Sequence, residues 1–552
     1  MILSFLYCIP LFTGIEVKAQ TTTQNPTHET VHILVEEGKT TISTNEKGEL
    51  ILTVPQNVID HSKSIGYIDY QAFGAKGDGK TDDIDAIAAT HALANRFNLP
   101  VKIGQKPTYY ISGKKRTVIV QTDTDFGIAE FIIDDREVED RNVSVFKVNS
   151  TNLPMKLEGI SSLKRNQTKI DVTLPQSCLI TVNNAHVKHY IRYGLNQNNG
   201  SEQTDIFLVD KNGNVDMNAP IIWDFDQITE MTALPIDEKV LQIKGGRFMT
   251  IANNEESKYN YYKRNFAIER SNVIMDGIEH RISGEGEQGA PYGGFLAISD
   301  CSDVTIKNAL LTGHKTYTTI GTAGKPVTMG TYDLLAGRAL NVSFINCSQT
   351  NDINDRTYWG ILGSNYCKNL LYDNCTLSRF DAHKGVANAT IRNSTLGHMG
   401  INAIGSGTFI VENSTIQGWS LINLRSDYGS TWQGDMIIRN CTFKPREGTG
   451  NNISLIGGSY SGQHNFGYTC FMPEKISIEN LVIDDTRTSK NYKGPTIFSD
   501  FNPEMKDKNY TQAFPNVITK NVILKNIQTA SGKALRLSDN MVMFKEVKVL
   551  SQ

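Results

Sequence analysis

The 552-residue chain has little cysteine, little proline and no strong excess of charge of either sign. Eight cysteines are too few to predict a fold held by disulfides, so the fold must depend on a long buried core, which 39% hydrophobic residues permit. A net charge of −3 excludes a global attraction to nucleic acid, so an acidic ligand requires a local basic cluster. Beyond the first residues, no apolar run approaches the ~20 residues of a membrane span.

The first residues form an apolar run that ends in Val17-Lys18-Ala19. Small residues at this spacing are typical of the cleavage site of a secretory signal, although the basic residues that usually precede the apolar run are missing. The sequence therefore predicts a signal peptide over residues 1–19 and a secreted or periplasmic protein.

A short alternating strand that ends in asparagine recurs along the second half of the chain. The copies end at Asn308, Asn346, Asn374, Asn393, Asn413, Asn440, Asn480 and Asn526. The shortest intervals, near twenty residues, predict one bare coil of a β-solenoid, and the longer intervals predict inserted loops. Asparagine tolerates a left-handed corner and can bond its counterparts above and below. The following residue is mostly small, so we expect Cys347, Cys375 and Cys441 to be reduced and buried.

The stretch Phe73–Ile87, FGAKGDGKTDDIDAI, places Gly-rich turns before a helix that starts near Asp82 and Asp83. It resembles the entry motif of the pectate-lyase-like superfamily, FGAxGDGxTDDxxAI. The resemblance implies an all-β fold, a single-stranded right-handed parallel β-helix with an N-terminal cap helix. Asp82 and Asp83 are interpreted as helix-capping residues rather than as an acid and base pair.

The asparagine repeat also divides the chain. We expect residues 20–136 to form the N-terminal cap and first coil. The segment 32–97, which includes a hairpin turn at Asn45–Gly48 and the cap helix, should cover the open end. From 137 to 244 the repeat disappears and short alternating runs with turn signals replace it, which predicts an inserted β subdomain. Residues 245–552 then form the main β-helix and carry the groove.

Stacked parallel strands place equivalent residues of successive coils about 4.8 Å apart, so outward positions can form a groove. Burial of Ile422 and Leu424 would turn Asn423 and Arg425 outward, and Asp381 shares a face with His383. The predicted ladder comprises Arg356, Tyr358, His383, Asn402, Asn423 and Arg425. Loops beside it carry His314, His398, Tyr428 and Trp432, and an aromatic and basic loop carries Tyr261 and Arg264.

These residue types suit removal of the proton α to a uronate carboxylate. Such a reaction needs a group that neutralises the carboxylate, a base, and an acid for the departing oxygen. We expect Arg425 with Asn402 to neutralise, His383 to act as base with its ring oriented by Asp381, and Tyr358 or Tyr428 to act as acid. The next candidates for the base are His398 and His314. The expected substrate-binding residues are Arg356, His314, Asp381, Asn423, Trp432, Tyr261 and Arg264.

Two other functions stay open. A glycoside hydrolase needs two carboxyl groups roughly 5–10 Å apart, and Asp381, Asp427 and Asp435 are available. Polygalacturonases of this fold carry an Asn-Thr-Asp, an Asp-Asp pair, a Gly-His-Gly and an Arg-Ile-Lys motif. The chain has Gly397-His398-Met399-Gly400 but not the others, so the resemblance fails at the carboxylates. A non-catalytic glycan-binding β-helix would instead show Thr, Ser and Asn outward, without His and Arg.

The family resemblance favours a polysaccharide lyase that acts on a glycosaminoglycan, such as chondroitin sulfate, dermatan sulfate or hyaluronan, over one that acts on pectate. Calcium-dependent pectate lyases use clustered Asp on the sheet, which is not evident here. A divalent cation such as calcium is therefore only a possible cofactor, and no metal ligand is assigned. We expect a monomer whose partner is an acidic polysaccharide.

Overall fold

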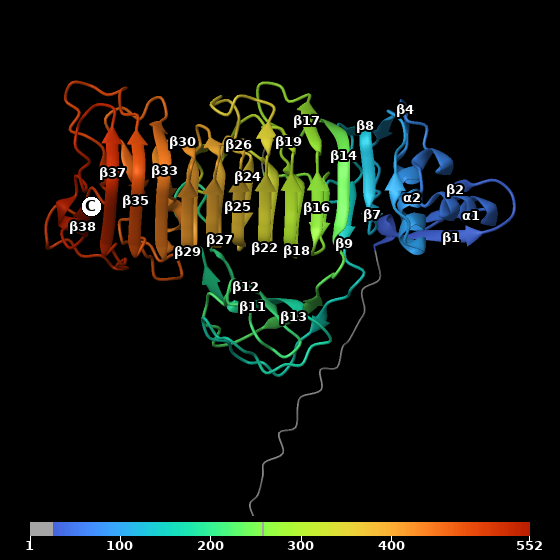
Figure 1. The fold of residues 1–552 in the computed structure, drawn as a ribbon, viewed down its shortest axis with the longest axis horizontal. Helices are drawn as coiled ribbons and strands as arrows, with labels where there is room; N and C mark the ends of the chain where they lie inside the picture. Colours follow the sequence, from blue (N-terminus) through green and yellow to red (C-terminus); the bar gives the residue numbers. More distant parts are fainter. Residues whose placement is uncertain (1–25, 257–258, 552) are drawn as a thin grey trace, which may run out of the picture.

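The computed structural model of the protein describes residues 26–256 and 259–551, so the predicted signal peptide lies outside the described residues. Most of the chain is a right-handed parallel β-helix whose coils follow one another along the long axis (Figure 1). One continuous sheet of 29 strands winds around it, and successive coils pair in parallel. Within the described part of the chain, no helix is long and apolar enough to cross a membrane.

The continuous sheet has three faces, here called sheets A, B and C in the order in which each coil passes through them. Sheet A includes β7 (Val118–Val120), β9 (Phe146–Asn149), β15 (Phe266–Glu269), β24 (Leu362–Asn365), β31 (Ser420–Leu424), β34 (Ser454–Gly457) and β36 (Thr496–Phe498). Sheet B includes β5 (Val101–Lys102), β16 (Val273–Asp276), β25 (Lys368–Asp373), β32 (Trp432–Gln433) and β38 (Lys548–Ser551). Sheet C includes β4 (Asp78–Asp82), β6 (Thr108–Ile111), β17 (Glu279–Ser283), β19 (Leu310–Leu311), β23 (Ser348–Gln349), β26 (Thr376–Leu377), β28 (Thr395–Leu396) and β30 (Thr415–Gly418).

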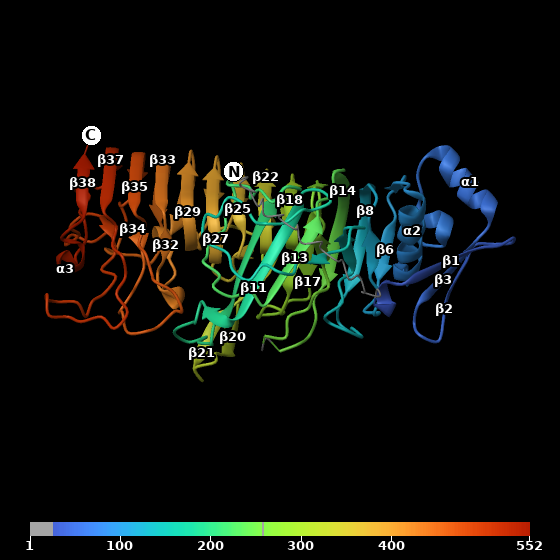
Figure 2. The same ribbon diagram turned by 90° about the horizontal axis from the view of Figure 1, so that it is seen from below.

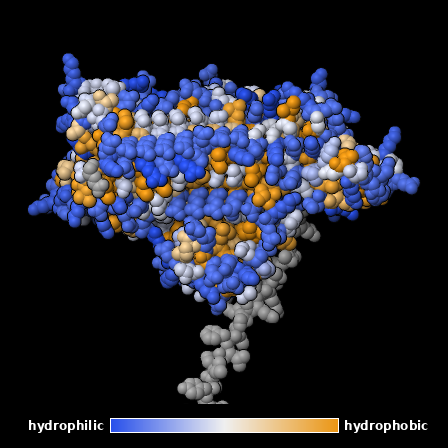
Figure 3. Space-filling view, viewed as in Figure 1, coloured by the Kyte–Doolittle hydropathy of each residue, from blue (hydrophilic) through white to orange (hydrophobic). Residues whose placement is uncertain are grey.

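Longer strands continue around a corner from one sheet to the next. Four pass from sheet A to sheet B: β18 (Gly293–Lys307), β22 (Tyr332–Ile345), β27 (Phe380–Arg392) and β29 (Ile401–Glu412). Five pass from sheet B to sheet C: β8 (Thr124–Asp134), β14 (Leu241–Ile251), β33 (Asp435–Pro445), β35 (Lys475–Ile483) and β37 (Asn521–Thr529). Figure 3 shows the result on one face, where hydrophilic side chains form rows along the axis of the coil.

The repeated asparagines mark the corner between sheets B and C, as predicted. All eight have a left-handed backbone, with φ between 49° and 54°. Their side chains form a ladder in which each amide donates to the amide oxygen of the coil before, at distances from 2.7 to 3.4 Å. Two members donate to an aspartate instead: Asn308, at the start of the ladder, to Asp276 at 2.7 Å, and Asn393 to Asp373 at 2.9 Å. The repeat in the sequence is therefore one structural corner, used in successive coils.

The core fills the interior of the coil with stacked rows of apolar side chains. Near the N-terminal end, Phe146 stacks on Phe266 with ring centroids 4.4 Å apart. The predicted row of small residues is confirmed, because Cys347, Cys375 and Cys441 are free and buried. The described chain contains seven cysteines, all unpaired and buried.

The N-terminal segment covers the open end of the coil (Figure 1). It comprises η1 (Thr27–Glu29), β1 (Val31–Val35), β2 (Thr41–Thr44), β3 (Leu50–Val54), α1 (Gln56–Ile65), η2 (Tyr70–Phe73) and α2 (Ile84–Phe97). Asp83 is the residue before α2, and its carboxylate accepts from the backbone N–H of Lys76 and Gly77 at 2.7 and 3.1 Å. It therefore holds the Gly-rich turn against the cap helix, a structural task. A short helix, α3 (Met541–Phe544), lies near the other end.

The inserted subdomain is an antiparallel sheet of four strands, namely β10 (Met155–Lys156), β11 (Cys178–His189), β12 (Ser201–Val209) and β13 (Glu230–Pro235). It has its own core, which includes Phe207 and Phe225, and it lies across the coil in Figure 2. Its boundaries differ from the expected 137–244, since β9 continues the coil to Asn149 and β14 resumes it at Leu241. Within residues 20–136, β4 already belongs to the continuous sheet.

Substitution of Asn440 tests the asparagine ladder, because this residue donates to Asn413 at 3.1 Å and accepts from Asn480 at 2.8 Å. Asn440→Ala loses both bonds and leaves a left-handed residue without the polar side chain that lets asparagine adopt this backbone, which costs roughly 1–2 kcal/mol for the backbone alone. Asn440→Gly loses the same bonds without that strain and should destabilise less. Urea unfolding measures both variants; equal losses of stability would contradict the role of the left-handed corner.

Candidate functional site

A segment of the inserted subdomain crosses the face of sheet A. Residues 190–200, here called the strap, connect β11 to β12. At one side the N–H of Ala323, in the turn between β20 (Tyr317–Ile320) and β21 (Pro326–Met329), donates to the carbonyl of Leu195 at 3.0 Å. At the other side Ile191 N–H donates to the carbonyl of Phe466 at 3.1 Å. Figure 2 shows β11 running across the coil toward this hairpin.

Beneath the strap lies a group of ionisable side chains, here called the charged cluster: Arg192, Arg379, Asp381, His383, Lys384, Arg425, Asp427 and Tyr428. They come from the strap, from β27 and the residue before it, and from the short helix η3 (Ser426–Tyr428) and its N-cap residue Arg425. Four basic side chains face two carboxyl groups, so the cluster has an excess of at least two positive charges. The chain as a whole is slightly acidic, and this cluster supplies the local basic charge that an acidic ligand requires.

Arg425 and Asp427 form the centre of the cluster. Arg425 binds Asp427 through two bonds, Nε to Oδ1 at 3.1 Å and Nη2 to Oδ2 at 2.7 Å. Arg192 of the strap binds the same carboxylate at 2.8–2.9 Å. Burial opposes the charge of Asp427, but Arg425 and Arg192 hold its pKa below the ordinary value. The strap thus closes on the coil through an ion pair, and Arg192 also lies over the ring of Tyr428.

Asp381 is fully buried behind this pair. Its Oδ2 lies 2.6 Å from Nη2 of Arg379 and 3.5 Å from Nη1 of Arg425. Burial raises the pKa of Asp381 even though both guanidinium groups lower it. Asp381 and Asp427 thus share Arg425 while their pKa values shift in opposite directions.

His383 lies next to this pair, half-buried, with its ring edge-on to Tyr428 at 5.3 Å between centroids. Its Nδ1 lies 2.8 Å from Oδ1 of Asn365, which only accepts, so Nδ1 carries the proton and Nε2 keeps its lone pair. Burial, followed by Arg425 and Arg379, holds the pKa of His383 well below its usual range. The imidazole is therefore neutral. The expectation that Asp381 orients this ring is wrong, since Asn365 does so.

Lys384 and Tyr428 complete the cluster. Lys384 donates to Ser201 at 2.9 Å, and burial together with Arg192 and Arg425 lowers its pKa to about 8. Burial raises the pKa of Tyr428 to about 12, so its hydroxyl stays protonated. The cluster thus holds a neutral base, a weak acid and several cations side by side.

The outward row of sheet A agrees in part with the predicted ladder. Asp381, Asn402 and Asn423 are paired across successive strands, and Asn423 donates to Asn402 at 2.7 Å. Arg356 and Tyr358 are not on this sheet. Both belong to the loop that precedes β24, where Tyr358 pairs with Lys315. This loop lies in the 28-residue interval between the repeated residues Asn346 and Asn374. The alternation of apolar and polar residues within strands could not predict the path of such a loop.

Three further expectations are corrected by burial. Trp432 is fully buried in the core, where its Nε1 donates to the carbonyl of Gly407 at 2.9 Å, so it cannot contact a ligand in the groove. Arg264 is also buried, and its Nε binds Asp135 at 2.8 Å. His398 lies in the turn before β29, where its Nδ1 is 3.0 Å from the carbonyl of Ile353 and its own carbonyl accepts from Arg446 at 3.3 Å, so its polar contacts are outside the charged cluster. Burial lowers its pKa.

Tyr261 lies near the cluster together with other tyrosines. Its hydroxyl is 3.5 Å from that of Tyr317, and the charge of Arg192 acts on it. Burial raises its pKa. Tyr261 is thus the one residue of the predicted aromatic and basic loop that stays a candidate for binding.

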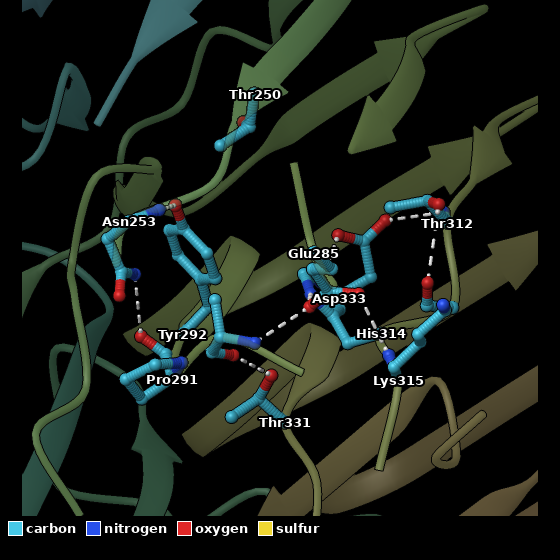
Figure 4. Close-up of polar contacts among 12 residues, drawn as sticks. Thr250, Asn253, Glu285, Pro291, Tyr292, Thr312, His314, Lys315, Thr331 and Asp333 are labelled. Atoms are coloured by element: carbon cyan, nitrogen blue, oxygen red, sulfur yellow. Dashed lines mark hydrogen bonds and ion pairs between the residues drawn. The ribbon is translucent and has the colours of Figure 1, made fainter. Parts of the chain in front are cut away.

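His314 belongs to a separate buried network, shown in Figure 4. Its Nδ1 lies 3.4 Å from Glu285, and its Nε2 lies 3.4 Å from Asp333. Asp333 also accepts from His280 Nδ1 at 2.7 Å and from the N–H of Thr312 at 2.8 Å. Burial opposes the charge of His314, but Asp333 and Glu285 raise its pKa to about 9. A cationic, enclosed imidazole is unsuited to act as a base, so His314 supports the loops beside sheet A.

The network around His314 predicts a pH-dependent stability. Because its folded pKa, about 9, exceeds the ordinary value of 6.5, the stabilisation is fully present below pH 6.5 and is lost as pH rises through about 9. The full effect is about 3 kcal/mol. His314→Gln should remove it, so the stability difference between wild type and variant, measured by urea unfolding, should shrink from pH 6 to 10. A difference that stays constant would contradict the ion pairs, and the exposed His186→Gln is the control.

The most informative residues of the cluster were missed by sequence reasoning. Arg192 comes from the inserted subdomain, 233 positions before Arg425, and no pattern in the sequence connects them. Arg379 and Lys384 flank the predicted Asp381 and His383 and could have been found there. Within the described residues, no group of three or more His, Cys, Asp or Glu side chains is arranged to hold a metal.

Comparisons with known proteins add the following. No family model matches the chain. A depolymerase described as specific for capsule KL64, from Klebsiella phage P510, is 29% identical over 122 residues, which are 20% of this chain and only 12% of that protein. Among solved structures, the tailspike gp61 of Pseudomonas phage phi297 is 11% identical, covers 88% of this chain and 84% of its own, and has a TM-score of 0.46.

Two other solved structures are more distant. PfbA, a surface adhesin of Streptococcus pneumoniae, is 11% identical with a TM-score of 0.39 over 85% of this chain and 92% of its own. An exopolygalacturonase from Thermotoga maritima is 9% identical with a TM-score of 0.33 over 88% of this chain and 91% of its own. None of these structural likenesses carries an argument about the reaction.

Proposed function

We propose that the protein degrades an acidic, uronate-containing polysaccharide by β-elimination at the charged cluster. The observation that carries this proposal is the state of His383, a neutral imidazole with a free Nε2 that is held among cations. A base in this setting can approach a proton next to a carboxylate, because the surrounding cations attract that carboxylate. The match to a protein named as a capsule depolymerase supports a polysaccharide as the substrate class.

The residues take the following roles. Nε2 of His383 removes the proton α to the uronate carboxylate. Lys384 and Arg425 stabilise the negative charge that develops there. The C4–O4 bond breaks as the C4–C5 double bond forms, and Tyr428 gives its hydroxyl proton to the departing O4. Tyr358, the other expected acid, lies outside the cluster.

The substrate is a uronate polymer. Glycosaminoglycans such as chondroitin sulfate, dermatan sulfate and hyaluronan fit the positive cluster, and so does an acidic bacterial capsule. Pectate is less favoured because the described residues contain no carboxylate cluster for calcium. The proposed protein is secreted or exported to the periplasm and acts as a monomer. Its inserted β subdomain separates the N-terminal cap and first coil from the main β-helix.

His383→Ala should lower kcat by about 10²–10⁴, the range typical of a lost general base. The measurement is the ultraviolet absorbance of the unsaturated uronate during incubation with a panel of uronate polysaccharides. His186→Ala changes an exposed histidine of the subdomain and should leave the rate unchanged. Full activity of His383→Ala on a substrate that the wild type cleaves would refute His383 as base.

Lys384 should set the alkaline limit of substrate binding. Its ammonium, with a pKa of about 8, attracts a carboxylate below that pH and loses its charge above it, so KM should rise above pH 8. Lys384→Arg should move this rise to higher pH because a guanidinium stays charged. Lys384→Met should raise KM below pH 8, toward the value that the wild type reaches above it, and so remove the rise. If the KM of Lys384→Met still rises near pH 8, another group is responsible.

A glycoside hydrolase is the second candidate, because Asp381 and Asp427 share Arg425 and have pKa values shifted in opposite directions. A carboxyl with a raised pKa close to one with a lowered pKa is the kind of pair that hydrolysis uses. This candidate predicts new reducing ends without ultraviolet absorbance. Asp427→Asn would then abolish cleavage, while His383→Ala would have a small effect.

A further inference from the structure

A cavity lies between the inserted subdomain and the coil, apart from the charged cluster. Its volume is about 340 Å³. Its walls include His189, Tyr190, Gln203 and Trp223 from the subdomain and Gln433 and Tyr468 from the coil. The arginines and carboxylates of the charged cluster do not line it, and the proposed reaction makes no use of it.

Aromatic rings form the walls of this cavity. Trp223 packs on His189 with centroids 4.3 Å apart, and Tyr190 packs on Tyr468 at 4.9 Å. Trp223 is half-buried and keeps part of its ring accessible. Aromatic faces of this kind contact the C–H face of a pyranose ring, while a small number of polar groups bind its hydroxyls.

Gln203 supplies a polar group without a partner. The residue is 5% exposed, and its Nε2 donates to the carbonyl of Asp224 at 2.9 Å. Its Oε1 is buried and has no hydrogen-bond partner among the described residues. An unpaired buried amide oxygen costs roughly 1–3 kcal/mol, so an orphan that lines a cavity points to a ligand that donates to it.

The interior of the cavity is uncharged. Burial lowers the pKa of His189 to about 4, so its imidazole is neutral, and no described residue bonds its ring nitrogens. The charged residues of the cavity, Arg165 and Asp224, are exposed and of opposite sign. Arg165 is held at this place by Gln433, 2.5 Å from its Nη1. Neutral hydroxyl groups therefore suit this cavity, whereas a carboxylate would face the unpaired oxygen of Gln203.

We propose that this cavity binds one neutral pyranose, with its ring against Trp223 and a hydroxyl donating to Oε1 of Gln203. The site is independent of the reaction at His383 and would exist even if the charged cluster proved non-catalytic. Tyr190 connects the two places, because it packs on Tyr468 in the cavity and on Tyr428 in the charged cluster, 6.2 Å away. A neutral branch of a glycan whose acidic residue lies at His383 could reach the cavity along this wall.

The test measures binding directly, by saturation-transfer NMR with the methyl glycosides of glucose, galactose, mannose and N-acetylglucosamine. Methyl glucuronide serves as the charged counterpart. We expect at least one neutral glycoside to bind and the glucuronide to bind more weakly at this cavity. Gln203→Met keeps the size of the side chain but removes the acceptor, and should weaken binding about tenfold, the effect of one hydrogen bond.

Two further variants keep the result interpretable. Ser406→Phe adds a ring to a half-buried position of the cavity wall without removing any packing and should abolish binding. Trp419→Ala removes an exposed tryptophan outside the cavity and should bind like wild type. Urea unfolding confirms that each variant is folded.

The outcomes separate the two proposals. Neutral-glycoside binding should persist in His383→Ala, even where that variant has lost β-elimination, so failure of one proposal does not imply failure of the other. The pyranose site is refuted if no neutral glycoside binds the wild type, if the glucuronide competes best, or if folded Gln203→Met and Ser406→Phe both bind like wild type.

Discussion

The left-handed asparagine corner is the constraint on which the rest of the structure depends. The chain has to turn from sheet B to sheet C at the same place in every coil. A residue with positive φ at this corner is strained unless it is glycine or asparagine. Asparagine adds a side chain that bonds the next coil, so the corner also fixes the register between coils. Once the register is fixed, inward rows pack as a core and outward rows align as a face.

The coil supplies one wall of the charged cluster, and the inserted subdomain supplies the other. Arg192 reaches Asp427 from the strap, and the strap is fixed at both sides of sheet A by backbone hydrogen bonds. The subdomain is thus part of the site and not an appended module. The cavity proposed to bind a pyranose is also formed by both parts of the chain, since it lies where Trp223 and Gln203 of the subdomain meet the coil.

Burial lowers the pKa of both His383 and His314, but the charged neighbours of the two histidines act in opposite directions. His383 is surrounded by cations, so its neighbours reinforce the effect of burial and the ring stays neutral. His314 lies between two carboxylates, which overcome burial and keep the ring charged. A neutral imidazole suits a base, and a charged enclosed one suits a structural ion pair. The residue type is the same, and the neighbours decide which role it can take.

The sequence by itself determined the parallel β-helix, the asparagine corner, the buried cysteines and the capped N-terminal end, because these follow from patterns that are local or repeat at a fixed spacing. It also gave part of the outward row, Asn402 and Asn423 beside Asp381, since alternation within a strand decides which side chains point out. The same alternation could not place Arg356 and Tyr358, which lie in a loop whose path no repeat describes.

Only the tertiary structure decided which residues meet. Trp432 and Arg264 were expected to bind substrate. Trp432 instead fills the core, and Arg264 is buried in an ion pair with Asp135. The burial of a residue depends on what packs around it and not on its type. Arg192 joined the cluster although it lies far from it in the chain, because the inserted subdomain folds back across sheet A. Asn365, and not Asp381, is the partner of His383, because the pairing of β24 with β27 shifts register at this place and leaves His383 between the paired residues Ala382 and Lys384.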